Sequence, residues 1–265
     1  MTQTQISSEK EITNAGISVS SYLFRIISAV LGGIVGSLVL VLFFILANTL
    51  LSPVLSSSGE GTIGSVFVFI VMIMVFLSTL FGNVIATFLI SLTEREKYKR
   101  RSTAISQIAI MSIIVVIFML PVYFITATID VQMVVYAVAL HMILTVLTSS
   151  LTLEIVSNYR YSLVGLYGVT LAIIVSSAVL FVFAKVVENI AILLFVALPI
   201  IWGTMALVQG LTFMVYASFA KLYDKDFLST QTMYGDDYGK EVEEEEEIID
   251  EKQIPEEEGA SFLRK

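Results

Sequence analysis

The residue with the clearest chemical potential is His141, which lies near the middle of a long apolar segment of the chain. An ionisable group inside a bilayer is costly to bury, so such a group is a candidate for function. Imidazole also exchanges a proton near neutral pH. We therefore consider His141 a candidate for a proton relay or a substrate contact. The alternative is a structural histidine that is hydrogen-bonded to Thr145 or to a serine of a neighbouring helix.

Three residues of the last apolar segment lie at a depth similar to that of His141. Pro199 and Gly203 favour a kink, and Trp202 is a tryptophan at the centre of a span rather than at its interface, where tryptophans are enriched. A kinked helix beside His141 would line a midplane cavity, with carbonyl groups freed by Pro199 available to a ligand. The alternative is that the indole fills the gap that the kink creates.

Other kinds of site find little support. The chain has no cysteine and a single histidine, which argues against thiolate chemistry and a transition-metal site. Its apolar segments contain no pair of carboxylates for acid and base catalysis, so we predict no catalytic, cofactor or metal residues. We expect Arg25 to extend to lipid phosphates. We expect Glu154 to be solvated at headgroup level, with Arg160 as an alternative partner.

The elements that position these residues are apolar helices. Hydrophobic residues make up 57% of the 265 residues and charged residues only 14%, well below the usual charged fraction of about 25% in soluble domains. A spanning helix needs about 20 apolar residues, and six segments are long enough. The sequence thus predicts an all-α, polytopic transmembrane bundle. The six spans run over about 22–51, 63–92, 104–128, 131–158, 162–184 and 189–220.

The distribution of basic residues predicts the orientation of the bundle. With the N-terminus inside, ten Lys and Arg residues fall at the cytosolic side, five of them in the loop 93–103, and only Lys185 falls outside. Because cytoplasmic loops retain positive charge, we place both termini in the cytosol. The predicted location is a cytoplasmic-type cell membrane, with residues 1–21 as a cytosolic N-terminal segment.

Small residues recur every fourth position on the first and fifth spans. In lipid, such ladders let helix backbones approach closely. We interpret them as internal packing faces of the bundle. A homodimer seam on the first span is the alternative. The residues concerned are Ser28, Gly32 and Gly36, and Gly168, Ala172 and Ser176.

The C-terminal segment 221–265 is acidic, with fifteen acidic and six basic residues. It is too polar to form a core and is expected to be disordered. It would bind a basic cytosolic partner or the chain's own basic loop, 95–101. The alternative is a solvated segment without a partner, repelled by anionic lipids.

These observations lead to two functional hypotheses. The first is a non-enzymatic membrane scaffold, in contact with lipids and with other membrane proteins or further copies of itself, that presents its acidic segment to the cytosol. The second is a small transporter or channel that uses the cavity predicted around His141, Pro199, Trp202 and Gly203. An intramembrane enzyme is a weaker third hypothesis. Nucleic-acid binding is not expected, because the basic loop is interrupted by Glu94 and Glu96.

Overall fold

A computed structural model describes residues 19–57, 60–95, 97–129, 133–158, 161–187 and 189–223. The N-terminal segment up to residue 18 and the acidic segment from residue 224 lie outside the described residues. The predictions of a cytosolic N-terminus and a disordered acidic tail therefore concern parts of the chain that the structure does not describe.

The described chain is helical, and the six predicted apolar helices are confirmed. All six are long and apolar enough to cross a membrane. A five-residue π-helical turn, η1, follows the fourth of them without a break. The helices are α2 (Val19–Ser57), α3 (Glu60–Thr93), α4 (Arg101–Ile129), α5 (Met133–Thr152), α6 (Ser162–Val186) and α7 (Ile190–Tyr223), and η1 spans Leu153–Ser157.

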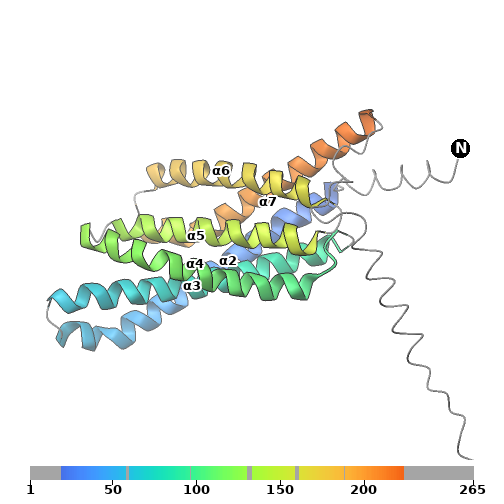
Figure 1. Cartoon of the computed structure of the whole chain (residues 1–265). Helices are drawn as coiled ribbons and strands as arrows, with labels where there is room; N and C mark the ends of the chain where they lie inside the picture. Colours follow the sequence, from blue (N-terminus) through green and yellow to red (C-terminus); the bar gives the residue numbers. More distant parts are fainter. Residues whose placement is uncertain are drawn as a thin grey trace, which may run out of the picture.

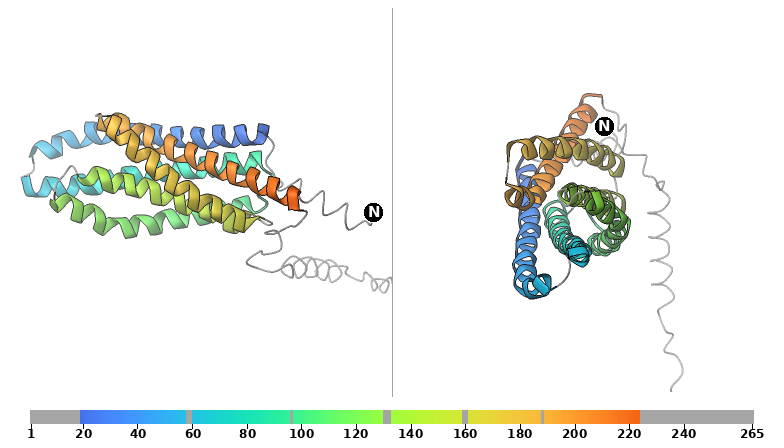
Figure 2. Two further views of the ribbon diagram at one scale, coloured as in Figure 1. Left: turned by 90° about the horizontal axis from the view of Figure 1, so that it is seen from above. Right: turned by 90° about the vertical axis from the view of Figure 1, so that its left-hand side faces the viewer.

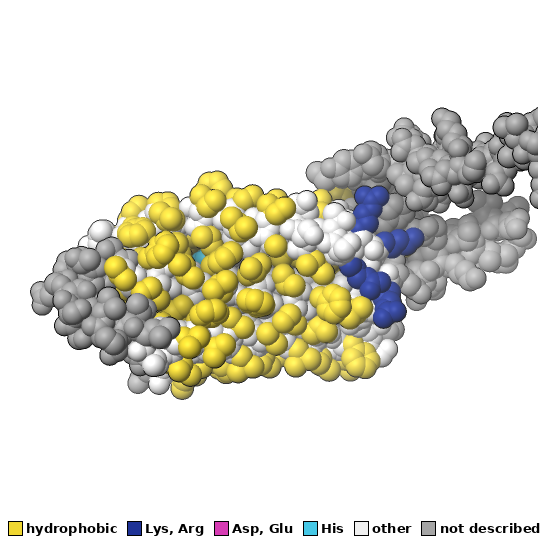
Figure 3. All heavy atoms as spheres, turned by 90° about the horizontal axis from the view of Figure 1, so that it is seen from below, with side chains coloured by type: hydrophobic (Ala, Val, Ile, Leu, Met, Phe, Trp, Pro, Cys, Tyr) yellow, Lys and Arg dark blue, Asp and Glu magenta, His cyan; other side chains and the backbone are white. Residues whose placement is uncertain are grey.

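The outer surface of the bundle is apolar over most of its length. Side chains such as Phe118 and Ile117 are 73% and 63% exposed, which in water would leave a large apolar surface uncovered. The space-filling view shows apolar side chains along the length of the bundle, with Lys and Arg side chains gathered at one end (Figure 3). This distribution is that of a multi-pass membrane protein with its lipid-facing surface in the middle.

The helices run along one long axis, and α7 crosses its neighbours obliquely (Figure 1, Figure 2). We call one end of the bundle the basic end: there α2 begins, α3 leads into α4, η1 leads into α6, and α7 ends. We call the opposite end the far end. Because the number of spans is even, α2 begins and α7 ends at the same end of the bundle (Figure 1).

Glycines of α2 make its contacts with α3 and α7 close. A methyl group at Gly32 would overlap the backbone of Ala86 on α3, and one at Gly33 would lie 2.6 Å from the Cα of Pro199 on α7. Gly36 lies against Gly82 and accepts a 2.7 Å hydrogen bond from Ser78 at its carbonyl. The small-residue face of α2 is thus covered from within the same chain, where the alternative hypothesis placed a second copy.

The small residues of α6 face α7. Gly168 lies against Gln209 and Thr212, Ala172 is fully buried, and the Ser176 hydroxyl lies 2.6 Å from that of Thr204. These contacts bring the last helix against both α2 and α6. Two helices far apart in the sequence, α2 at the start of the described chain and α7 at its end, are therefore packed against each other.

Candidate functional site at the basic end

The guanidinium of Arg25 lies at the centre of a buried polar cluster. Its Nη1 donates hydrogen bonds of 2.8 and 2.9 Å to both carboxylate oxygens of Glu94, and one of 3.1 Å to the hydroxyl of Tyr98. Its Nη2 donates to Gln209 Oε1 at 2.9 Å and lies 3.5 Å from Glu154 Oε1. The Arg25 side chain is 0% exposed. One side chain of α2 thus joins the loop that follows α3, the π-helical turn η1 and α7.

The carboxylate of Glu154 is directed into this cluster by η1. Tyr98 donates a 2.7 Å hydrogen bond to its Oε1, and Asn158 donates one of 2.6 Å to its Oε2. Glu154 is the second residue of this π-helical turn, an element that is rare and is found frequently at functional sites. Gly165 of α6 faces the carboxylate so closely that a Cβ there would overlap Glu154 Oε2. A side chain at position 165 would therefore displace the Glu154 carboxylate from this position.

Two loops at the basic end are joined beside Glu154. Tyr98 and Asn158 form an isolated antiparallel bridge, and the Lys99 amide donates to the Ser157 carbonyl at 3.2 Å. The Asn158 side chain then accepts a 3.0 Å bond from the Tyr161 amide, at the beginning of α6. The loop between α3 and α4 and the one between η1 and α6 are thus fixed to each other.

Lys97 completes what we call the ion cluster: Arg25, Glu94, Lys97 and Glu154. Its Nζ lies 3.4 Å from Glu94 Oε2 and 3.0 Å from the ring centroid of Phe213. With all four groups ionised the cluster holds two positive and two negative charges. Buried charges require this kind of pairing, because an unpaired ion loses its hydration without replacement.

The pKa values at the edge of the cluster follow from burial and pairing. Burial lowers the pKa of Lys97 to about 8, although the charge of Glu94 opposes the shift. For Glu94, burial acts to raise the pKa, but the positive charges of Arg25 and Lys97 outweigh it, so the pKa lies below its ordinary value. Burial raises the pKa of the Tyr98 hydroxyl well above its ordinary value. At neutral pH Tyr98 therefore keeps the proton that it donates to Glu154.

Two predictions from the sequence are wrong at this site. Arg25 does not extend to lipid phosphates, and Glu154 is not solvated at headgroup level, since both are fully buried and paired with each other. Sequence position gives the depth of a residue but not the side of the helix on which it lies. Arg25 and Glu154 carry opposite charges and lie at a similar depth near the same end of the bundle, and these two facts together could have identified them as an ion pair.

His141 lies deeper in the bundle and is also fully buried. Its Nδ1 is 3.1 Å from the hydroxyl of Tyr123 on α4, with the two rings edge to face. Thr145, the partner suggested by the sequence, donates instead to the backbone carbonyl of His141. The ring is therefore oriented by a tyrosine that the sequence analysis did not single out.

The three cavity candidates of α7 have partners of their own. The indole of Trp202 donates a 2.9 Å hydrogen bond to Asn83 Oδ1 on α3. Pro199 packs against Gly33, and Gly203 faces Val30, both on α2. These contacts lie between α7, α2 and α3, whereas the hydrogen bond of the His141 ring is to α4. A cavity shared by His141 and the α7 residues stays a prediction.

Comparison of the chain with protein-family models, with curated proteins and with solved structures finds no match.

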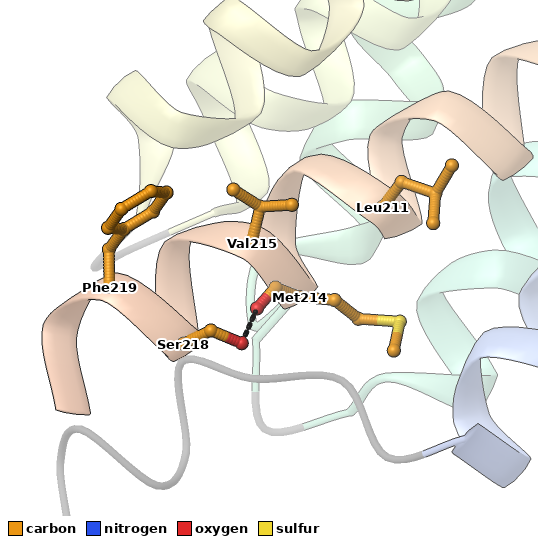
Figure 4. Close-up of a pocket in the computed structure, with 5 residues that line it drawn as sticks. All are labelled: Leu211, Met214, Val215, Ser218 and Phe219. Carbon is orange, nitrogen blue, oxygen red and sulfur yellow. Dashed lines mark hydrogen bonds between the residues drawn. The ribbon is translucent and has the colours of Figure 1, made fainter. Parts of the chain in front are cut away.

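An open depression lies elsewhere, on the side of α7 near the basic end (Figure 4). The Ser218 hydroxyl beside it donates to the carbonyl of Met214, at 2.9 Å. Leu211, Val215 and Phe219 are exposed and spaced every fourth residue along the helix, as expected of a surface that contacts lipid tails. The residues that line the depression are Leu211, Met214, Val215, Ser218 and Phe219.

The ion cluster is arranged for holding structure together. Both oxygens of each carboxylate accept bonds from donors of this chain. Among the residues that the structure describes, no group of three His, Asp or Glu side chains is placed to hold a metal ion. This geometry supports a structural role, in which the ion cluster holds the helices and the two loops of the basic end in fixed positions relative to one another.

Proposed function

We infer that the chain is a non-enzymatic membrane scaffold whose basic end forms a fixed platform for interactions in the cytosol. The observation that carries this proposal is the burial of Arg25 between Glu94, Glu154 and Gln209. A buried, multiply bonded guanidinium fixes geometry, because its planar donors match their partners in one arrangement.

The platform is supported by what surrounds the cluster. Arg95, Lys99 and Arg100 are exposed at the same end, where the basic side chains gather in Figure 3. Beyond α7 the sequence continues into the acidic segment, which contains five consecutive glutamates at 243–247. The negative charges of this segment would attract a positively charged partner, and such charge complementarity raises the rate of encounter and the specificity more than the affinity. The proposed partner is a basic cytosolic protein, or a neighbouring membrane protein with a basic loop.

The experiment is cross-linking and purification from native membranes. Full-length protein is compared with a variant that lacks residues 241–265 and with a full-length variant in which Glu243 to Glu247 are all glutamine. Both variants are expected to lose the same cross-linked partner. The glutamine variant removes only the negative charges, so its loss of the partner would assign binding to those charges. An identical set of partners for all three proteins would contradict the scaffold proposal.

A second candidate function, transport, is favoured by one observation. Polar groups of Asn83 and His141 lie buried in the middle of the bundle without a hydrogen-bond partner. Against transport, the buried residues of α3 and α5 toward the far end are apolar, including Met72, Val75 and Val138. Flux of a proton-coupled substrate in liposomes that is lost in His141→Ala, with normal expression, would favour transport over the scaffold.

A further inference from the structure

Polar atoms without a partner are concentrated between the middle of the bundle and its basic end. Buried polar groups in native proteins almost always bond to protein or to ordered water. A helical serine or threonine can turn its hydroxyl to the carbonyl one turn earlier. Asn83 Nδ2 and His141 Nε2 cannot form this local hydrogen bond to their own helix, so they need another partner. The unpaired atoms are Arg25 Nε, Ser37 Oγ, Asn83 Nδ2, Thr87 Oγ1, His141 Nε2, Ser149 Oγ, Ser150 Oγ and Ser157 Oγ.

Four of these atoms, on Asn83, Thr87, His141 and Ser149, lie on two helix faces that lead toward the ion cluster. Asn83 and Thr87 are four residues apart on one face of α3, Glu94 follows seven residues after Thr87 just beyond the end of this helix, and α3 packs directly against α5. On α5, residues four apart share a face in the same way. That face carries His141, Thr145 and Ser149 and leads to Glu154.

The depths of the two faces match. At about 1.5 Å of rise per residue, Asn83 lies about 16 Å and His141 about 20 Å from the level of the two glutamates, with Thr87 and Ser149 between. Because Glu94 and Glu154 both contact Arg25, the two faces end at the same place. Along the bundle axis, polar groups therefore succeed one another at intervals of about 3–8 Å from mid-bundle to the ion cluster.

The chemistry of the unpaired atoms fits water. The Asn83 carbonyl already accepts from Trp202, so its Nδ2 offers only N–H donors. Hydroxyl groups both donate and accept, and no carboxylate lies between His141 and the cluster on either face. Water, with two donors and two acceptors, is bound by two to four such groups, whereas a metal cation would need several oxygen ligands.

We propose that α3 and α5 enclose a file of ordered water molecules that runs from His141 and Asn83 to the ion cluster and is closed toward the far end. Val138 on α5 and Val75 on α3 are both buried, and these apolar side chains would close the file toward the far end. The file lets the His141 ring exchange protons with solvent at the basic end only. This site is independent of the partner proposed for the acidic segment.

The test uses the absence of cysteine from the chain, so that each introduced thiol is unique. Thr87→Cys and Ser149→Cys are compared with Val138→Cys, a buried control one turn beyond His141. The full-length proteins in liposomes are treated with silver ion, which is small enough to follow a narrow water path. Thiols left unmodified are then counted with a maleimide after denaturation.

Silver is expected to modify Thr87→Cys and Ser149→Cys at least about tenfold faster than Val138→Cys, because a thiol reacts as the thiolate, which forms in water and not in an apolar environment. Equal protection of all three would show a dry interior, and equal reaction of all three would show a path without closure. Either result overturns the proposal. Correct folding of each variant is checked by the fluorescence of Trp202, the single tryptophan of the chain.

A second measurement needs no cysteine. The chain has one histidine, so a ¹⁵N-histidine label gives the ring signals of His141 alone in solid-state NMR. Magnetisation transfer from water to this ring is expected in the native protein and is expected to fall in Thr87→Val. It should stay unchanged in Ser112→Ala, whose hydroxyl already donates to the Ile108 carbonyl. No transfer to His141 in the native protein would refute the water file.

Discussion

The two halves of the bundle are built from different interiors. On α3 the buried residues toward the far end are Val68, Met72, Met74 and Val75, while those toward the basic end include Asn83, Thr87 and Ser91. In a membrane, apolar side chains gain little from burial against one another, since lipid is equally apolar. The far half therefore depends on packing, and the basic half adds hydrogen bonds and charge pairs that fix one arrangement.

The largest expected effect is at the centre of the basic half. Arg25→Met leaves Glu94 and Glu154 buried without their cation, and removing one partner of a buried ion pair costs about 3–5 kcal/mol. Thermal unfolding in detergent, followed by Trp202 fluorescence, should show a large fall in Tm. The control is Arg100→Gln, which removes an exposed charge and should leave Tm unchanged. Equal effects of the two substitutions would contradict the structural role of the ion cluster.

The next effect separates two glycines of α6. Gly165→Ala places a methyl group against the Glu154 carboxylate, whereas in Gly168→Ala the nearest atom is 3.5 Å away, an ordinary contact. Overpacking of this kind costs about 1–3 kcal/mol, so Gly165→Ala should lower Tm and Gly168→Ala should not. A larger loss in Gly168→Ala would show that Glu154 does not occupy this position.

A smaller effect is expected near the boundary of the two halves. Tyr123→Phe removes the hydroxyl beside His141 Nδ1, and the loss of one buried hydrogen bond costs about 1 kcal/mol. In ¹⁵N spectra the two ring nitrogens of His141 should also shift, because the tautomer is set by the bond at Nδ1. Unchanged ring signals would show that Tyr123 does not orient His141.

The smallest effect is a pH dependence. The pKa of Lys97 in the folded protein, about 8, lies below the ordinary lysine value, so between the two the unfolded chain binds more protons. Stability should then rise as pH increases from 8 to 9.5, by on the order of 1 kcal/mol. The window stays below the titration of ordinary tyrosines. Lys97→Met should abolish this rise in Tm, and a rise of the same size in that variant would assign it to another group.

The sequence predicted the six helices better than the contacts between them. Length and hydropathy are sufficient to identify six helices, because every backbone polar group in lipid must be bonded within its own segment. They do not identify which faces meet. The ion cluster was missed because its members come from α2, the α3–α4 loop and η1, and because the π turn that contains Glu154 leaves no signal in composition.

The same limit applies to the deeper residues. His141 and Trp202 were found because a histidine and a tryptophan are conspicuous at mid-membrane depth. Tyr123, the hydrogen-bond partner of His141, was not, since a tyrosine in a helix has many ordinary roles. Residue type identified the groups that need partners, and only the fold identified the partners.

The bond between Arg25 and Gln209 has a consequence for biosynthesis. Arg25 belongs to α2 and Gln209 to α7, the first and the last of the six described helices, so α2 is synthesised well before α7. Until translation has supplied α7, the guanidinium lacks one of its acceptors and the covering ring of Phe213. Insertion of α7 therefore completes the surroundings of the guanidinium, and a chain that stops before α7 keeps a cation with fewer partners.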